Sequence, residues 1–172
     1  NGVFKPVSSR YAADIDMYTA IFAQDIPAGV GVLSMNFSGQ VGHGEDGSAY
    51  NKRGLFRVRS NGKWIGVTQL SAIDARAVFP CWDEPARKAV FRLTLVVDRH
   101  LTALSNMEED SSIVAVTDPR KKAVKFAPTP IMSTYLLAFT IGEFDHVSST
   151  SKTTGVRVSA YASPGFAEQG RT

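Results

Sequence analysis

The sequence is poor in the residues that build disulfides, thiolate metal sites and membrane spans. Its 172 residues include one cysteine, Cys81, and three histidines. A single cysteine excludes a disulfide within the chain and a zinc site made of thiolates, and it favours a reducing compartment, which predicts the cytoplasm. The longest apolar runs, such as that at 135–139, fall far below the roughly 18 residues of a spanning helix, so we expect no membrane segment.

The charge is nearly balanced, and it contains no strong signal for nucleic-acid binding. The chain has 19 basic and 16 acidic residues, which gives a net charge of +3. The one dense basic run, Arg120-Lys121-Lys122, is not interleaved with aromatic residues as nucleic-acid surfaces are. We interpret this run as a solvated turn and expect no nucleic-acid partner. A hydrophobic fraction of 44% is sufficient for the core of one domain.

The histidines do not follow a catalytic or metal-binding pattern. His43, His100 and His146 stand far apart, and none has a second histidine four positions later, as a helical zinc pair requires. The sequence also lacks a phosphate-binding glycine-rich motif and a Gly-x-Ser-x-Gly nucleophile elbow. We therefore expect no catalytic residue and no metal ligand within these 172 residues.

The polar residues between 74 and 84 are interpreted as structural. Cys81 has no histidine near it in sequence, so a buried structural thiol is favoured over a nucleophile. Asp83 is placed to cap a helical turn that begins at Glu84, a role favoured over acid–base catalysis. Asp74 pairs with Arg76 in one interpretation, and in the other Arg76 binds backbone carbonyl groups.

Alternation of apolar and polar residues is the dominant pattern, and it is typical of half-buried strands. The expected strands lie at 17–22, 33–38, 55–59, 91–98, 113–116, 123–126 and 156–161. The stretch 133–144 is apolar on both faces, which predicts a central strand, and Asn61-Gly62 predicts a tight hairpin turn. Helical turns are expected at 71–79 and 84–89, and a mobile loop at 42–50. Short strands at this spacing predict a sandwich or a barrel.

The stretch from Thr68 to Phe91 has the most distinctive sequence. It contains the motifs Thr68-Gln69, Asp74-Ala75-Arg76, Phe79-Pro80-Cys81, Asp83-Glu84-Pro85 and Lys88-Ala89-Val90-Phe91. With these motifs the chain resembles the N-terminal domain of the M1 aminopeptidases, most of all their puromycin-sensitive branch. Further matches occur in the same order, at 103–107 and 129–136, and at 167–170 for the puromycin-sensitive branch. Upstream, residues 54–57 stand where the family has a Gly-Phe-Tyr-Arg stretch.

The resemblance implies an all-β fold: an antiparallel β-sandwich that forms a single domain over residues 1–172, with a short irregular helical segment around 71–89. It also implies a larger multidomain parent, in which a thermolysin-like catalytic domain hydrolyses N-terminal residues from peptides. That domain would hold zinc through a His-Glu-x-x-His helix and a distant glutamate, and this chain would bind none. The expected partners are peptide substrates and the catalytic domain of the same protein.

Two residues would contribute to the substrate site of such an enzyme. The resemblance implies that Gln69 lines the pocket for the first side chain of the peptide. Ser71 stands where most members have Glu or Gln, which helps to hold the free amino terminus. Because serine is shorter and uncharged, it cannot replace a carboxylate that pairs with an ammonium group. A second departure, Ala77-Val78, is expected to change only surface charge.

Two other interpretations stay open at this point. One is an M1-like scaffold without catalysis, which Ser71 slightly favours. The other is a free-standing β-sandwich that binds a protein partner, which predicts a surface without an apolar docking face. The aminopeptidase interpretation predicts an exposed apolar face where the catalytic domain would sit.

Overall fold

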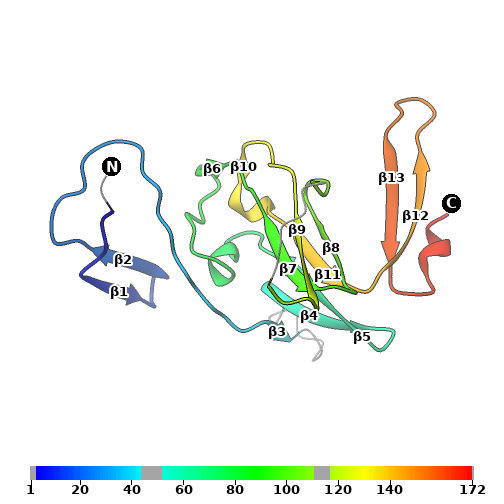
Figure 1. Cartoon of the computed structure of the whole chain (residues 1–172), viewed down its shortest axis with the longest axis horizontal. Coiled ribbons are helices and arrows are strands. Elements are labelled where there is room, and N and C mark those ends of the chain that lie inside the picture. Colours follow the sequence, from blue (N-terminus) through cyan, green and yellow to red (C-terminus); the bar gives the residue numbers. More distant parts are fainter. Residues whose placement is uncertain (1–2, 44–51, 111–116, 172) are drawn as a thin grey trace. The chain divides into compact units, whose positions relative to one another are not determined.

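A computed structural model describes residues 3–43, 52–110 and 117–171. The chain divides into two compact units, residues 1–37 and 38–172 (Figure 1). The first unit contains a hairpin of β1 (Ser8–Ala12) and β2 (Met17–Ile21), which pair antiparallel. In its turn Asp16 has a φ of 50° and accepts a 2.8 Å hydrogen bond from the Tyr11 hydroxyl group. Short polar residues such as aspartate tolerate this left-handed conformation in turns.

The strand expected at 33–38 does not form, which corrects the prediction. Residues 31–41 belong to no strand, and the side chains of Leu33, Met35 and Phe37 are exposed. The alternation is present, but a strand also needs a hydrogen-bonded neighbour, and no described strand pairs with this segment. The local pattern alone therefore does not determine the strand.

A five-stranded sheet forms the centre of the second unit. Its order is β3 (Gly42–His43), β4 (Gly54–Ser60), β5 (Lys63–Gln69), β11 (Phe139–Gly142) and β8 (Thr102–Ser105). All neighbours are antiparallel except β3 and β4. Asn61 and Gly62 join β4 to β5 with φ angles of 48° and 77°, which confirms the expected tight turn.

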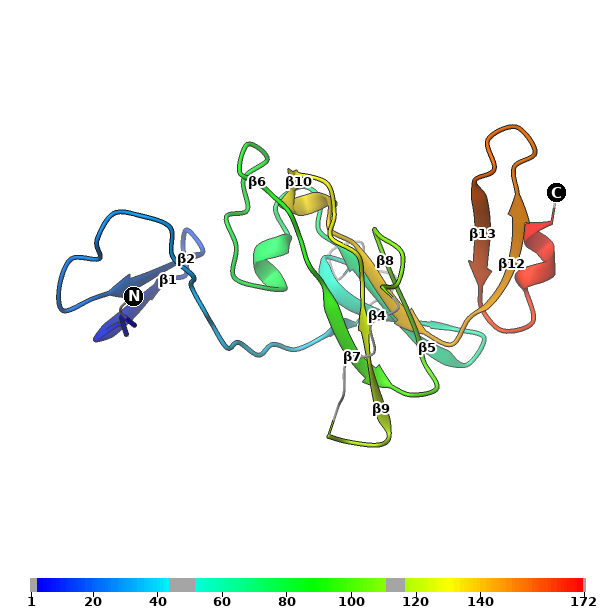
Figure 2. The same cartoon turned by 45° about the horizontal axis from the view of Figure 1, so that its top comes forward.

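A second layer covers one part of this sheet. The antiparallel ribbon of β7 (Thr94–Asp98) and β9 (Lys121–Lys125) lies beside β8 and β11 in both views (Figures 1 and 2). The core between the layers contains Val97, Ala103, Val124 and Phe126, with Ile141 of β11 packed against it. The arrangement is all-β and layered, as predicted.

Irregular chain and very short elements form the next part of the unit. The 3-10 helix η2 (Ala75–Ala77) follows β5, and β6 (Lys88–Ala89) pairs with β10 (Met132–Ser133). A second 3-10 helix, η3 (Thr134–Leu136), connects β10 to β11. Leu70, Ala75 and Leu137 form the buried core of this part.

A hairpin and a 3-10 helix complete the unit. β12 (Asp145–Thr150) pairs antiparallel with β13 (Arg157–Ala162), and η4 (Ala167–Gly170) follows. A β-carbon at Gly170 would lie 3.0 Å from the Ala160 side chain, so η4 packs closely on this hairpin. The turn at Asn61 holds the hairpin through a 3.2 Å bond from its amide to the Pro164 carbonyl group.

Three sequence predictions need adjustment in detail. The apolar stretch 133–144 begins as β10 and η3, and only its end forms β11, which lies between β5 and β8 as a central strand. The helical turn expected at 84–89 is shorter than predicted: the Arg87 N–H donates to the Glu84 carbonyl group over 2.9 Å, but Lys88 and Ala89 are extended and pair with β10. The strand at 91–98 begins only at Thr94.

Two further predictions concern residues outside the described part of the chain: the strand at 113–116 and most of the mobile loop at 42–50. Within the described residues, no helix is long and apolar enough to span a membrane.

Candidate functional site at the end of strand β5

Gln69 is the last residue of β5, and the chain turns sharply after it. Gln69 and Ser71 are exposed, whereas Leu70 between them is only 2% exposed. The Gln69 Oε1 atom accepts a hydrogen bond from the Ser71 backbone N–H over 3.3 Å, so the two predicted site residues lie together. The Ser71–Ala72 peptide bond is cis. The structure therefore presents both polar residues on the surface and fixes the residue between them in the core.

Hydrogen bonds across the sheet hold this strand end. The Thr68 hydroxyl group donates to the Phe139 carbonyl group over 3.1 Å, and its oxygen accepts from the Phe139 N–H over 2.9 Å. On the other side, Gln69 lies opposite Gly54 in the register of β4 and β5. The last residues of β5 are thus fixed from both neighbouring strands.

An ion pair links the start of β4 to the turn that follows Gln69. Asp74 is 7% exposed and accepts hydrogen bonds from Arg53 through Nε, at 2.8 Å, and through Nη2. The Asp74 backbone N–H donates to the Leu70 carbonyl group over 3.0 Å. The neighbouring carboxylate raises the pKa of the Arg53 guanidinium group, first by hydrogen bonding and then by charge.

A second ion pair joins η2 to the segment that follows it. Asp83 is 6% exposed and accepts from both the backbone N–H and the Nε of Arg76, each over 3.1 Å. The Arg76 Nη2 atom donates to the Asp83 carbonyl group over 3.2 Å. Two predictions are corrected here, because Asp74 pairs with Arg53 rather than Arg76, and Asp83 binds Arg76 instead of capping a helix. The predicted contact of Arg76 with a carbonyl group is confirmed.

The two longest motif segments meet at this place. The Ser133 hydroxyl group donates to the Pro85 carbonyl group over 2.6 Å, and the Thr134 hydroxyl group donates to the Trp82 carbonyl group over 3.3 Å. Ser133 and Thr134 are buried, and among the described residues every buried side-chain polar atom has a hydrogen-bond partner. Polar side chains thus satisfy the backbone of an irregular segment that has no ladder of its own.

Cys81 lies within this packed region and is not activated. It is partly buried against the core that contains Leu70 and Leu137. Burial and, to a smaller extent, the Asp83 charge raise the pKa of the thiol to about 11, although Arg76 acts in the opposite direction. The thiolate is therefore scarce at neutral pH, which agrees with a structural thiol rather than a nucleophile.

Several large apolar side chains on the same segments are exposed. Trp82 is 74% exposed and Ile131 is 71% exposed, and both belong to the motif segments. Ile73 and Leu136 are also about half exposed. In these irregular segments the buried polar atoms are therefore hydrogen-bonded, while several large apolar side chains are exposed to solvent.

Comparison with known sequences identifies the family. A profile of the peptidase M1 N-terminal domain matches residues 5–136. The chain belongs to this family. It is 41% identical over 150 residues to aminopeptidase M1-B of Oryza sativa subsp. japonica, which covers 87% of this chain and 16% of that protein.

Two animal aminopeptidases are also similar to this chain. The puromycin-sensitive aminopeptidase of Caenorhabditis elegans is 45% identical over 124 residues, which is 69% of this chain and 13% of that protein. Aminopeptidase N of Rattus norvegicus is 42% identical over 118 residues, which is 69% of this chain and 12% of that protein. This M1 N-terminal domain spans less than a fifth of the length of these relatives. The resemblance to the M1 family that the sequence motifs indicated is confirmed.

The described residues of this M1 N-terminal domain do not fit a zinc ion. No group of three or more His, Cys, Asp or Glu side chains lies close enough to hold a metal in the described ranges. The predicted separation of the histidines is clear in the fold: His43 is in β3, His100 follows β7, and His146 is in β12.

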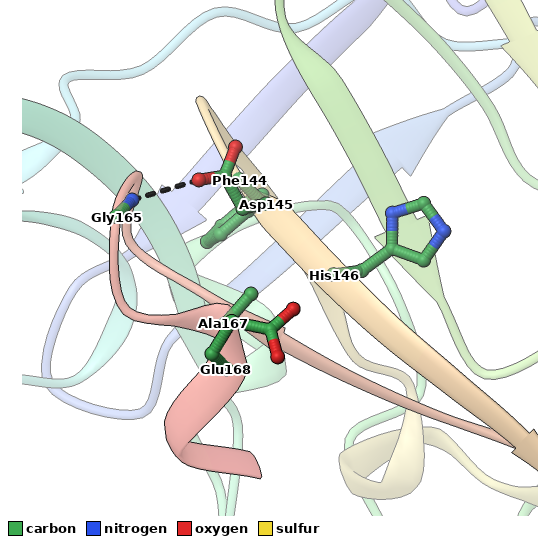
Figure 3. A pocket seen from close by; sticks show the side chains of 6 residues that line it. All are labelled: Phe144, Asp145, His146, Gly165, Ala167 and Glu168. Carbon is green, nitrogen blue, oxygen red and sulfur yellow. Dashed lines mark hydrogen bonds between the residues drawn. The ribbon is translucent and has the colours of Figure 1, made fainter. Parts of the chain in front are cut away.

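A shallow hollow beside the β12–β13 hairpin offers no catalytic pair. It is lined by Phe144, Asp145, His146, Gly165, Ala167 and Glu168 (Figure 3). The Asp145 carboxylate accepts a 2.7 Å bond from the Gly165 N–H, and the His146 ring lies away from both carboxylates (Figure 3). The His146 ring instead stacks on Tyr161 with centroids 5.0 Å apart. These groups stabilise the hairpin and its following turn.

The sequence interpretation missed Arg53. Its signal was weak, since Arg53 lies just before the Gly54-Leu55-Phe56-Arg57 stretch and 21 positions away from Asp74. Asp74 is buried in the structure and therefore requires a cationic or hydrogen-bonding partner, but no sequence pattern identifies that partner as Arg53.

Proposed function

We propose that this chain is the N-terminal domain of a zinc aminopeptidase that hydrolyses N-terminal residues from peptides. In this proposal the zinc ion and the catalytic groups belong to another part of the protein. The domain supports the catalytic domain, and Gln69 lines the pocket for the first side chain of the peptide. The observation that carries the proposal is the strand end of β5, where Gln69 and Ser71 are exposed while the adjacent Leu70 and Asp74 are buried.

The geometry of Gln69 supports a role in binding. A polar residue at a strand end commonly has no fixed neighbours, but Gln69 is positioned from both sides by Thr68 and the turn at Ser71. Binding groups work best when their supporting residues are rigid. Ser71 contributes no charge, so we propose that the free amino group of the peptide is held mainly by residues outside this domain.

The exposed apolar side chains support a docking role. Trp82 and Ile131 are large, exposed and carried by segments whose backbones are fixed by Ser133 and Thr134. Rigid apolar surface of this kind is typical of an interface. The relatives are more than five times longer than this chain, so they have ample polypeptide to cover such a surface.

A scaffold without catalysis is the second candidate. One observation favours it: Ser71 is exposed beside Gln69 and carries no charge with which to bind an ammonium group. In that case the same surface would still bind a second domain, but Gln69 would have no substrate.

The cytoplasm remains the proposed location, on the basis of the single cysteine.

The experiment is Gln69→Ala in the full-length protein that contains this chain. We expect kcat/KM to change unequally for substrates that differ only in the first residue, since Gln69 would contact that residue alone. The matched control is Gln169→Ala, which removes an exposed glutamine from η4. A uniform loss across substrates, or no change, would count against the pocket role.

A further inference from the structure

We propose that Arg53 is a positioning residue for the proposed first-residue pocket and acts through Asp74 on the turn that carries Gln69 and Ser71. The inference rests on the proposed function. Arg53 lies outside the proposed pocket, but in this proposal it helps to determine which first residue of the peptide is preferred.

Asp74 is connected to the pocket residues through the backbone of the turn. The Asp74 backbone N–H binds the Leu70 carbonyl group over 3.0 Å, and Leu70 lies between Gln69 and Ser71. The Asp74 side chain is only 9% exposed. Without Arg53, the turn would have to move before bulk water could hydrate the carboxylate. The location of the carboxylate and the location of the turn are therefore linked.

Arg53 lies at the start of β4, beside the end of β5. It directly precedes Gly54, which is the register partner of Gln69. Gly54 has a φ of 66°, and a β-carbon there would lie 3.2 Å from the Ala77 side chain and 3.6 Å from the Asp74 carbonyl oxygen. The start of β4 thus lies against Gln69 at one end of the turn and against Asp74 at the other. The Arg53 side chain adds a direct bond to Asp74.

The contact between Arg53 and Asp74 has a defined direction. Arg53 brings two N–H groups, Nε and Nη2, to the same Asp74 oxygen. The planar guanidinium group fixes the direction of both bonds, whereas the single ammonium group of a lysine fixes only a distance. Arg53 therefore orients the Asp74 carboxylate and also compensates its negative charge.

The turn also positions the Gln69 side chain at the surface of the proposed pocket. The Gln69 amide oxygen accepts from the Ser71 N–H over 3.3 Å, so the side chain follows the backbone of the turn. A displacement of the turn would move the amide that the substrate meets. Small misplacements of positioning groups have large effects on the reactivity of a bound substrate.

A second ion pair provides an internal control. Arg76 and Asp83 also hold a buried carboxylate, and the hydrogen bonds between them join η2 to the segment at Asp83 rather than to residues 69–71. A variant of Arg76 should therefore lower stability without changing the preference for the first residue.

The test uses the full-length protein and amide substrates that carry alanine, leucine or arginine as the first residue. For each variant we would measure kcat and KM separately, and the melting temperature by calorimetry. We expect Arg53→Gln to change the ratio of kcat/KM between substrates by about tenfold, and Arg53→Lys to change it by less. Arg76→Gln should leave the ratio unchanged.

A double variant separates positioning from general stability. If Arg53 acts through Gln69, Arg53→Gln should have no further effect on the ratio in a Gln69→Ala background, whereas independent effects would add. An unchanged ratio in Arg53→Gln, together with a changed ratio in Gln69→Ala, overturns this inference and leaves the proposed function intact.

An unchanged ratio in Gln69→Ala, or an inactive wild-type protein, overturns the proposed function and this inference together. If Arg53→Gln fails to fold, Arg53→Lys decides the question, because it keeps the charge and loses only the fork. A wild-type ratio in Arg53→Lys would then count against orientation by Arg53.

Discussion

Replacement of Leu70 by alanine should destabilise the domain strongly, because this residue joins the two motif segments. Leu70 is 2% exposed and packs with Ala75 and Leu137. Loss of three carbon atoms removes about 2.4 kcal/mol of transfer free energy, at about 0.8 kcal/mol for each. The cavity adds to this, because neighbours such as Leu137 collapse only partly, so we expect a total of about 3–5 kcal/mol.

Urea denaturation followed by circular dichroism measures the effect. With a slope of about 2 kcal/mol per molar urea, the midpoint should fall by about 1.5–2.5 M. Leu136→Ala is the matched control, since Leu136 is 47% exposed and its loss should cost less than about 1 kcal/mol. Equal losses in the two variants would refute the assignment of Leu70 to the core that supports Gln69.

Two further predictions test the surroundings of the site. Gly54→Ala should cost more stability than Gly155→Ala, because both residues have positive φ angles, of 66° and 71°, but a β-carbon has close neighbours only at Gly54. Equal melting temperatures would contradict the close packing of η2 on β4. Cys81 has a pKa of about 11 in the folded chain against an ordinary value of 9.0, so at pH 8 it should react with a thiol reagent about a hundredfold more slowly than in urea. Its rate should rise with pH up to about 11, and a folded rate equal to that in urea would show that the thiol is not buried as described.

The sequence predicted those features of the fold that depend on neighbouring residues. The Asn61-Gly62 turn and the strands around it follow from turn chemistry and alternation, and both are present. The strand at 33–38 failed because strands form only with a partner, and its alternation contained no information about pairing. The helical turn at 84–89 ends at Arg87 for a related reason, since β10 lies more than 40 positions away and holds Lys88 extended.

The candidate site was predictable only in part. Gln69 and Ser71 came from the family resemblance, and the structure adds that they are exposed and joined by a hydrogen bond. The contacts that support them, from Arg53 to Asp74 and from Thr68 to Phe139, cross 21 and 71 positions of sequence. No local pattern encodes such contacts, because they arise from the register of β4, β5 and β11.

The most direct test of the central claim is the zinc dependence of peptide hydrolysis by the full-length protein. We expect purified protein to release the first residue from peptides, to lose this activity with a chelator and to regain it with zinc. Peptides with an acetylated amino terminus should not be cleaved. An intact, folded full-length protein that neither binds zinc nor hydrolyses peptides would contradict the account and favour a scaffold.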